Sequence, residues 1–69
     1  MIVIQTQSKK GLTQIEEIAV NEKNTRQLIV WPGWKIVGEF ETPERALEVI
    51  ELVRQAINNG YRTFEIPKE

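Results

Sequence analysis

The residues best suited to chemistry are two tryptophans on either side of a Pro-Gly pair. Trp31 and Trp34 enclose the turn at Pro32–Gly33, Lys35 follows directly, and Arg26 precedes them on the adjoining segment. Aromatic rings beside basic side chains are typical of surfaces that stack bases and neutralise the phosphates of single strands. Glutamates at positions 16, 17, 39 and 41 interrupt this group. Nucleic-acid binding is therefore an alternative interpretation and not the favoured one.

The same two tryptophans also fit a structural role. Burying one tryptophan removes ~150–250 Å² from water, which at ~25 cal/mol per Å² contributes on the order of 4–6 kcal/mol. In a chain of 69 residues this is comparable with the whole net stability. We therefore expect at least one tryptophan to lie mainly in the core, and display of the pair to a protein, a ligand or a base is the alternative. In a hairpin of direct register the two rings would oppose each other and could stack.

The composition excludes most enzymatic chemistry. The chain has no cysteine and no histidine, which removes disulfides, thiolate ligands, the commonest metal ligand and the commonest general base. Ser8 is the only serine, so the ordinary nucleophile arrangements cannot be assembled. The carboxylate pairs Glu16–Glu17 and Glu39–Glu41 are interpreted as solvated strand faces, because so short a chain offers little room for a substrate cleft between them. The sequence predicts no enzyme, no catalytic residue, no cofactor and no metal.

Length and charge indicate one domain over residues 1–69 without a strong electrostatic preference. Nine basic and ten acidic residues give a net charge of −1, which favours neither nucleic acid nor an anionic membrane and lowers the barrier to self-association. The apolar run Leu28–Trp31 is far shorter than the ~20 residues that span a bilayer. The N-terminus has apolar residues first and lysines after, the reverse of a secretory signal. We expect a soluble cytoplasmic protein with no membrane partner.

Hydrophobic periodicity predicts strands on both sides of one helix. Runs of β-branched and apolar residues, alternating in part with polar ones, mark strands over residues 1–7, about 15–20, 25–31, 34–41 and 61–67. On the fourth of these Trp34 shares a face with Ile36, Gly38 and Phe40, and we expect a face that carries a tryptophan to lie under the helix. A left-handed residue at Gly60 is expected to end that helix.

The helix is predicted over about 43–58. Thr42 is its expected N-cap and Pro43 its first residue, and Glu51 and Arg54 are spaced for an ion pair. An apolar stripe is formed by Ala46, Val49, Ile50, Val53, Ala56 and Ile57. The predicted fold class is α+β, a small antiparallel sheet of four to five strands with this helix packed on one face.

Two of the predicted strands are apolar on both faces. Leu28 and Val30 point one way, and Ile29 and Trp31 point the other. A single helix covers only one face of a sheet. Three interpretations stay open: a strand with a few exposed aliphatic residues, a homodimer that covers the second face, and a sheet that curls toward a barrel.

One segment resembles a known group of proteins. The stretch "IVGEFETPERALEVIELV", Ile36 to Val53, resembles the pattern [LIV]-G-x-[FY]-x-[ST]-x-E-R-A-x-E-V-[LI] of small proteins from phages and mobile elements of Gram-positive bacteria. The ending "FEIP" and the opening "IVIQTQSKKGLTQIEEIAV" are also similar to the corresponding segments of those proteins. The resemblance implies a β-meander with a helix across it in a phage-like or plasmid-like setting. It contains no catalytic motif. The "WPGW" turn and the aspartate-free start depart from the pattern, so a shared ligand is not implied.

These observations predict a non-enzymatic protein-interaction module of phage or mobile-element type. We expect a homodimer that binds a host or phage protein, with Trp31, Trp34, Lys35 and Arg26 as the partner-binding residues. One alternative is an accessory nucleic-acid-binding protein that uses the Trp31/Trp34 turn and the basic residues near it. The other is a small-ligand sponge with a pocket formed between subunits.

Overall fold

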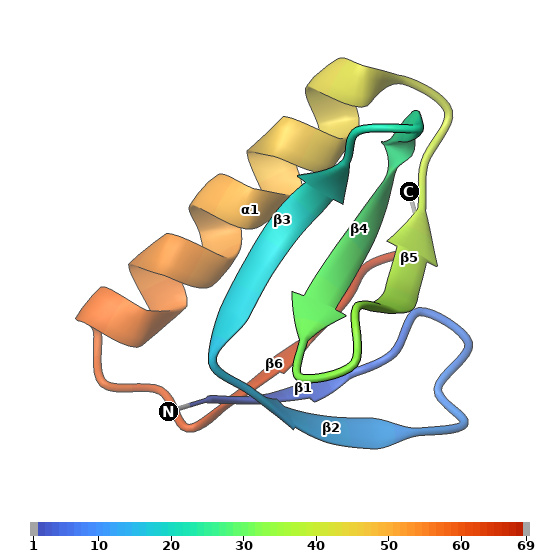
Figure 1. Ribbon diagram of the computed structural model, residues 1–69. Coiled ribbons are helices and arrows are strands. Elements are labelled where there is room, and N and C mark those ends of the chain that lie inside the picture. The colour runs from blue at the N-terminus through green and yellow to red at the C-terminus, as the bar shows by residue number, and fades with distance from the viewer. Residues whose placement is uncertain (1, 69) are drawn as a thin grey trace.

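The computed structural model describes residues 2–68 as two three-stranded sheets and one helix (Figure 1). In chain order the elements are β1 (Ile2–Gln5), β2 (Leu12–Ile15), β3 (Glu17–Asn21), β4 (Asn24–Trp31), β5 (Lys35–Glu39), α1 (Pro43–Asn58) and β6 (Thr63–Glu65). This confirms the α+β class with one helix packed on a sheet; of the predicted first strand, Met1 lies outside the described residues.

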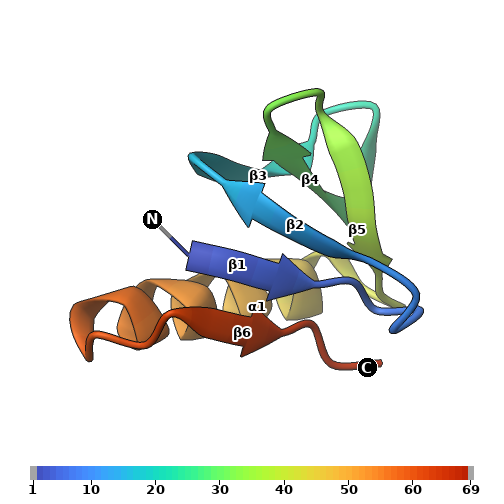
Figure 2. The same ribbon diagram turned by 90° about the horizontal axis from the view of Figure 1, so that it is seen from below.

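The strand order differs in detail from a single antiparallel sheet. One sheet has the order β2–β1–β6 and the other β3–β4–β5. Figure 2 shows β6, β1 and β2 side by side below the second sheet. β1 pairs with β2 antiparallel but with β6 parallel, because the chain returns to the first sheet only after the helical crossover. Such a pairing between the two ends of the chain cannot be read from local periodicity.

The division into two sheets occurs at Glu16. The sequence predicts one strand over about 15–20, but the chain bends at Glu16 between β2 and β3. Ile15 and Ile18 are three residues apart, so a straight strand would turn them to opposite faces. The bend lets Ile15 be buried in the core while Ile18 packs against the same core from the second sheet. The bend therefore separates β2 from β3, and residues 2–68 form six strands.

Helix α1 begins and ends as the sequence predicts. The Thr42 hydroxyl accepts a hydrogen bond from the Arg45 backbone N–H at 3.2 Å, which satisfies one of the free donors of the first turn. Gly60 has a φ of 80°, and the Tyr61 N–H donates to the Ala56 carbonyl at 2.9 Å. This is the Schellman arrangement that follows a left-handed glycine.

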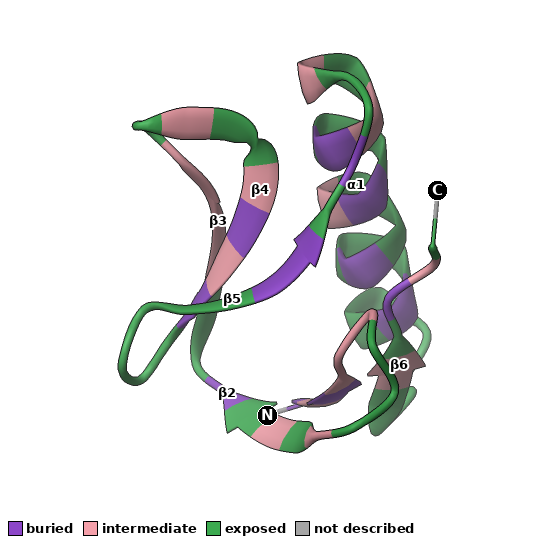
Figure 3. Cartoon of the chain, turned by 90° about the vertical axis from the view of Figure 1, so that its right-hand side faces the viewer, coloured by how far each residue is buried: buried purple, intermediate pink, exposed green. Residues whose placement is uncertain are grey.

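Both sheets and the helix share one core. Ile4 of β1, Leu28 and Val30 of β4, and Val49 and Val53 of α1 are fully buried. Figure 3 shows the buried positions of α1 on the side that faces the β3–β4–β5 sheet. The predicted helical stripe is confirmed at its buried members Ala46, Val49, Val53 and Ala56. It is wrong at Ile57, which lies in the last turn and is 52% exposed.

A bulge interrupts the pairing of β4 with β5. Leu28 and Ile29 are adjacent on β4, but their partners on β5 are Gly38 and Ile36. Val37 is the extra residue, as in a β-bulge, and its side chain is buried. Ile36 is exposed whereas Val37 and Phe40 are both buried, so the common face predicted for Ile36 and Phe40 does not hold across the bulge.

Gln7 joins the two sheets. Its backbone N–H donates to the Val37 carbonyl at 2.8 Å, and its side-chain oxygen accepts from the Glu39 N–H at 2.8 Å. The Gln7 side-chain amide donates to the carbonyls of Glu39 and Pro67, both at 2.9 Å. Gln7 alone therefore satisfies several free backbone groups along the edge of β5. It also holds the C-terminal segment beside β5.

Candidate functional site

The side of the β3–β4–β5 sheet that faces away from α1 carries an apolar row. Cross-strand partners point to the same side of a sheet, and Ala19, Ile29 and Ile36 are partners across the three strands. Glu17 and Trp31 form the next pair along the β3–β4 ladder. These five residues, with Trp34 from the following turn, are called the outer face. In Figure 3 the helix lies on one side of this sheet, and no described element covers the other side.

Trp31 and Trp34 lie in contact at one end of the outer face. Their ring centroids are 5.5 Å apart and their planes are inclined by 52°, an arrangement within the preferred range for aromatic pairs. This confirms the expectation that the rings meet across the turn. The Trp31–Pro32 peptide bond is cis, and Gly33 and Trp34 have positive φ values of 92° and 48°.

The expectation that at least one tryptophan lies mainly in the core is wrong. Trp31 is 42% exposed and Trp34 is 46% exposed. Trp31 follows Val30, which is fully buried, so alternation along β4 turns Trp31 outward. Trp34 and Ile36 also lie outside, although Phe40, predicted on the same face, is buried. The helix therefore covers the face of Val30 and not a face that carries a tryptophan.

The Lys35 side chain starts from the side of the sheet opposite to the outer face. It is the partner of Val30, whose side chain points into the core, and partners share a face. The Lys35 side chain runs along the turn, because a Cβ placed on Gly33 would lie 3.4 Å from Lys35 Cε. Lys35 therefore adjoins the tryptophan turn but does not belong to the outer face.

Arg26 lies far from the tryptophan pair. It is five residues before Trp31 on β4, which at ~3.3 Å per residue separates the two by roughly 17 Å. Its carbonyl accepts from the Phe40 N–H, and its guanidinium lies 3.8 Å from the Glu39 carboxylate. The structure thus brings two of the four predicted site residues together, places Lys35 beside them on the opposite face, and separates Arg26 from them.

Sequence reasoning counted Glu17 among the glutamates that interrupt the patch but not among the partner-binding residues, although it is the charged residue of the outer face beside the tryptophans. Glu17 is the cross-strand partner of Trp31 and is exposed. Within residues 2–68 it forms no ion pair, whereas Glu39 is paired with Arg26. The signal that could have revealed it is the hairpin register, which the "NEKN" turn and the two flanking strands define.

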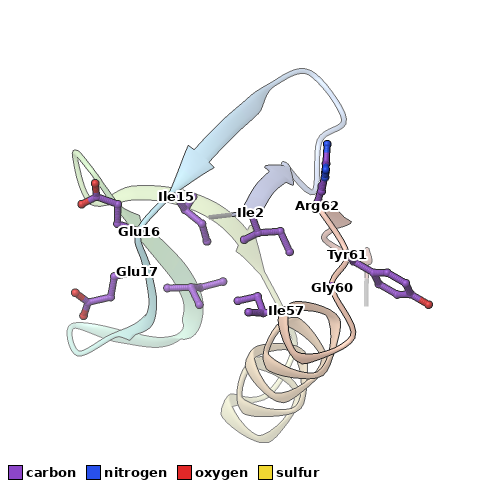
Figure 4. Close-up of a pocket in the computed structure, with 9 residues that line it drawn as sticks. Ile2, Ile15, Glu16, Glu17, Ile57, Gly60, Tyr61 and Arg62 are labelled. Atoms are coloured by element: carbon purple, nitrogen blue, oxygen red, sulfur yellow. The ribbon is translucent and has the colours of Figure 1, made fainter.

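Apart from the outer face, the chain has a cleft where the two sheets meet the end of α1. This cleft of about 610 Å³ has isoleucines on its inner side, Ile2, Ile15, Ile18 and Ile57. Figure 4 shows the Glu16 and Glu17 side chains at one rim, directed away from the isoleucines, and the Tyr61 ring directed away at the other. Arg62 and Gly60 complete the lining. The cleft is apolar inside and lies within a single chain, whereas the sponge alternative placed its pocket between subunits.

Other kinds of site receive no support from the described residues. No helix within residues 2–68 is long and apolar enough to cross a membrane, and no group of three acidic side chains in that range is placed to hold a metal ion. Comparison with known proteins gives no matching family model, no matching curated protein and no matching solved structure.

Proposed function

We propose that this chain is a non-enzymatic protein-interaction module and that the outer face is its binding surface. The observation that supports this proposal is the Trp31–Trp34 pair, which is about half exposed at the end of a sheet face that also exposes Ile36. Large aromatic side chains in a contiguous exposed patch are typical of protein-binding surfaces, where they act as anchors. The phage or mobile-element setting, the cytoplasmic location and the homodimer stay predictions.

The placement of the basic residues favours a protein partner over a nucleic acid. A single strand that stacked on the tryptophans would need cations beside them for its phosphates. The charged neighbour of Trp31 on the outer face is instead the carboxylate of Glu17. Arg26 is remote and engaged with Glu39. The nucleic-acid alternative keeps Lys35 beside the tryptophan turn but lacks Arg26 there, so this arrangement supports it less than a protein partner.

The proposal is tested by affinity capture from a lysate of the source cells. Wild type is compared with Ile36→Thr, which removes apolar surface from the outer face, and with Leu47→Gln, which removes an equally exposed apolar side chain from α1. We expect proteins retained by wild type and by Leu47→Gln to be lost with Ile36→Thr. Retention of the same proteins by all three chains would contradict the proposed surface.

A small-ligand function has one specific observation in its favour, the isoleucine-lined cleft. Its volume of about 610 Å³ lies within the ~300–1,000 Å³ that ligand pockets occupy. Such a cleft would take a small apolar molecule. Millimolar hexanol should then shift the methyl signals of Ile15 and Ile57, and Ile57→Glu should abolish those shifts. Unchanged methyl spectra would remove this second candidate.

A further inference from the structure

We infer that the partner of the outer face is a basic segment of another protein, with an arginine side chain seated on the tryptophan pair beside Glu17. This inference rests on the proposed function and names its ligand chemistry. The arginine would lie against an exposed ring of Trp31 or Trp34 and donate to the Glu17 carboxylate. An apolar side chain next to it on the same segment would cover Ile29 and Ile36.

The geometry of the tryptophan pair supports a cationic ligand. Each ring contacts the other at a centroid distance of 5.5 Å, yet 42% and 46% of the two side chains stay exposed. The exposed ring area attracts a cation placed within ~6 Å of a ring centroid, and tryptophan is the best aromatic residue for this interaction. A planar guanidinium stacks on such a ring more readily than an ammonium group does.

Glu17 supplies the countercharge at the right place. It lies directly opposite Trp31 across the β3–β4 ladder, and directly opposed residues on a strand pair have Cβ atoms about 4.5–5.5 Å apart. A guanidinium that stacks on Trp31 is therefore within reach of the Glu17 carboxylate, which accepts charge-assisted hydrogen bonds. Glu16, at the adjoining bend, is exposed as well and adds negative charge beside the same edge.

The charge of this surface argues against a second copy of the chain as the occupant. Glu39 and Arg26 compensate each other at 3.8 Å beyond the far end of the outer face. Glu17 stays uncompensated by any described side chain. The outer face of a second copy carries no basic residue to pair with Glu17, whereas a basic segment does, and such electrostatic complementarity favours one partner over another.

The spacing of the outer face suits an extended segment. Trp31 and Ile29 are two residues apart on β4, which corresponds to ~6.6 Å along the sheet. In an extended partner, side chains two residues apart share one face with the same spacing. An arginine flanked at that spacing by β-branched apolar residues would therefore match the tryptophan pair and the Ile29–Ile36 row together.

The test uses an acetylated and amidated pentapeptide of sequence valine–threonine–arginine–threonine–valine, with citrulline in place of arginine as the uncharged control. The readout is the indole Nε1–H signals of Trp31 and Trp34 in a ¹H–¹⁵N spectrum during titration. One exposed cation–π contact and one exposed ion pair together predict roughly 3- to 30-fold tighter binding of the arginine peptide. Glu17→Gln should remove a roughly 2- to 5-fold part of that preference, and Glu22→Gln, at the opposite end of the hairpin, should remove none.

The outcomes separate this inference from the proposed function. Equal binding of the two peptides by the wild type, or an arginine preference that Glu17→Gln leaves undiminished, overturns the basic-partner inference. The proposed function then stands or falls with the Ile36→Thr capture experiment alone. Tighter binding of an oligothymidylate than of the arginine peptide at the same indole signals also overturns the inference. A dimer that shields both indoles from either peptide overturns it in favour of a second copy.

Discussion

Glu17 and Trp31 face each other across the β3–β4 ladder, and both point away from the helix. This relationship combines a carboxylate with an exposed indole on the uncovered side of the second sheet. It depends on the bend at Glu16, which ends the first sheet just before Glu17. The feature that divides the fold into two sheets therefore also creates the charged part of the proposed binding surface.

The two tryptophans should stabilise the turn through each other. Because the rings are 5.5 Å apart and half exposed, we expect a double-mutant cycle with Trp31→Ala and Trp34→Ala to give a coupling of about 0.5–1.5 kcal/mol in urea unfolding. The matched cycle of Trp31→Ala with Leu47→Ala, a residue on the helix, should be additive. Additivity of the two tryptophan substitutions would show that the ring contact contributes nothing.

Gly38 should not tolerate a side chain. A Cβ at this position would lie 2.8 Å from Cγ2 of Ile66, and Ile66 is fully buried, so it has no free space to move into. We expect Gly38→Ala to lower the free energy of unfolding by about 1–3 kcal/mol. Gly11→Ala is the control, because its Cβ would meet Thr6 at an ordinary 3.7 Å. An equal effect of both substitutions would contradict the close approach of Ile66 to the bulge.

Gln7→Ala should loosen the junction between the two sheets. The substitution removes the side-chain hydrogen bonds to Glu39 and to Pro67. We expect a loss of about 1–2 kcal/mol in urea unfolding and faster hydrogen exchange of the Glu39 amide. Gln14→Ala, on the exposed side of β2, should change neither. Unaltered exchange at Glu39 in Gln7→Ala would show that the bridge does not hold the edge of β5.

Acid should weaken one surface contact of the helix. The hydrogen bonds that Arg54 donates to the Glu51 carboxylate, and the positive charge of Arg54, lower the pKa of Glu51 below its ordinary value. A carboxyl with a lowered pKa in the folded state contributes stability above its unfolded pKa and loses it as the pH falls through the folded pKa. An NMR titration should therefore show a lowered pKa for Glu51 in the wild type. The pKa should rise toward its ordinary value in Arg54→Gln, and the same pKa in both chains would contradict the pairing.

The local features of the fold were predictable from the sequence. Thr42, Pro43 and Gly60 define the helix ends through capping and backbone preference, which depend only on neighbouring residues. The structure accordingly has the helix at Pro43–Asn58. The Trp31–Trp34 contact was also predictable, because a Pro-Gly turn between two alternating strands defines which residues oppose each other.

The remaining features depend on long-range packing. The bulge at Val37 adjoins Gly38, against which Ile66 from near the end of the chain packs, and no local pattern reports that contact. The exposure of Trp31 follows from which face of β4 the helix covers. On β5 the bulge determines which side chains point toward the helix. The separation of Arg26 from Trp31 was available from strand geometry alone, so grouping them as one site was an avoidable error.

Acrylamide quenching of tryptophan fluorescence, with the mass determined by light scattering on the same sample, tests the central claim most directly. The account predicts a red-shifted, readily quenched emission from both indoles in the free chain, and protection from quenching when the arginine peptide is added. A blue-shifted emission that acrylamide does not quench, at the mass of a dimer, would contradict it. The outer face would then be occupied by a second copy and not available to a basic partner.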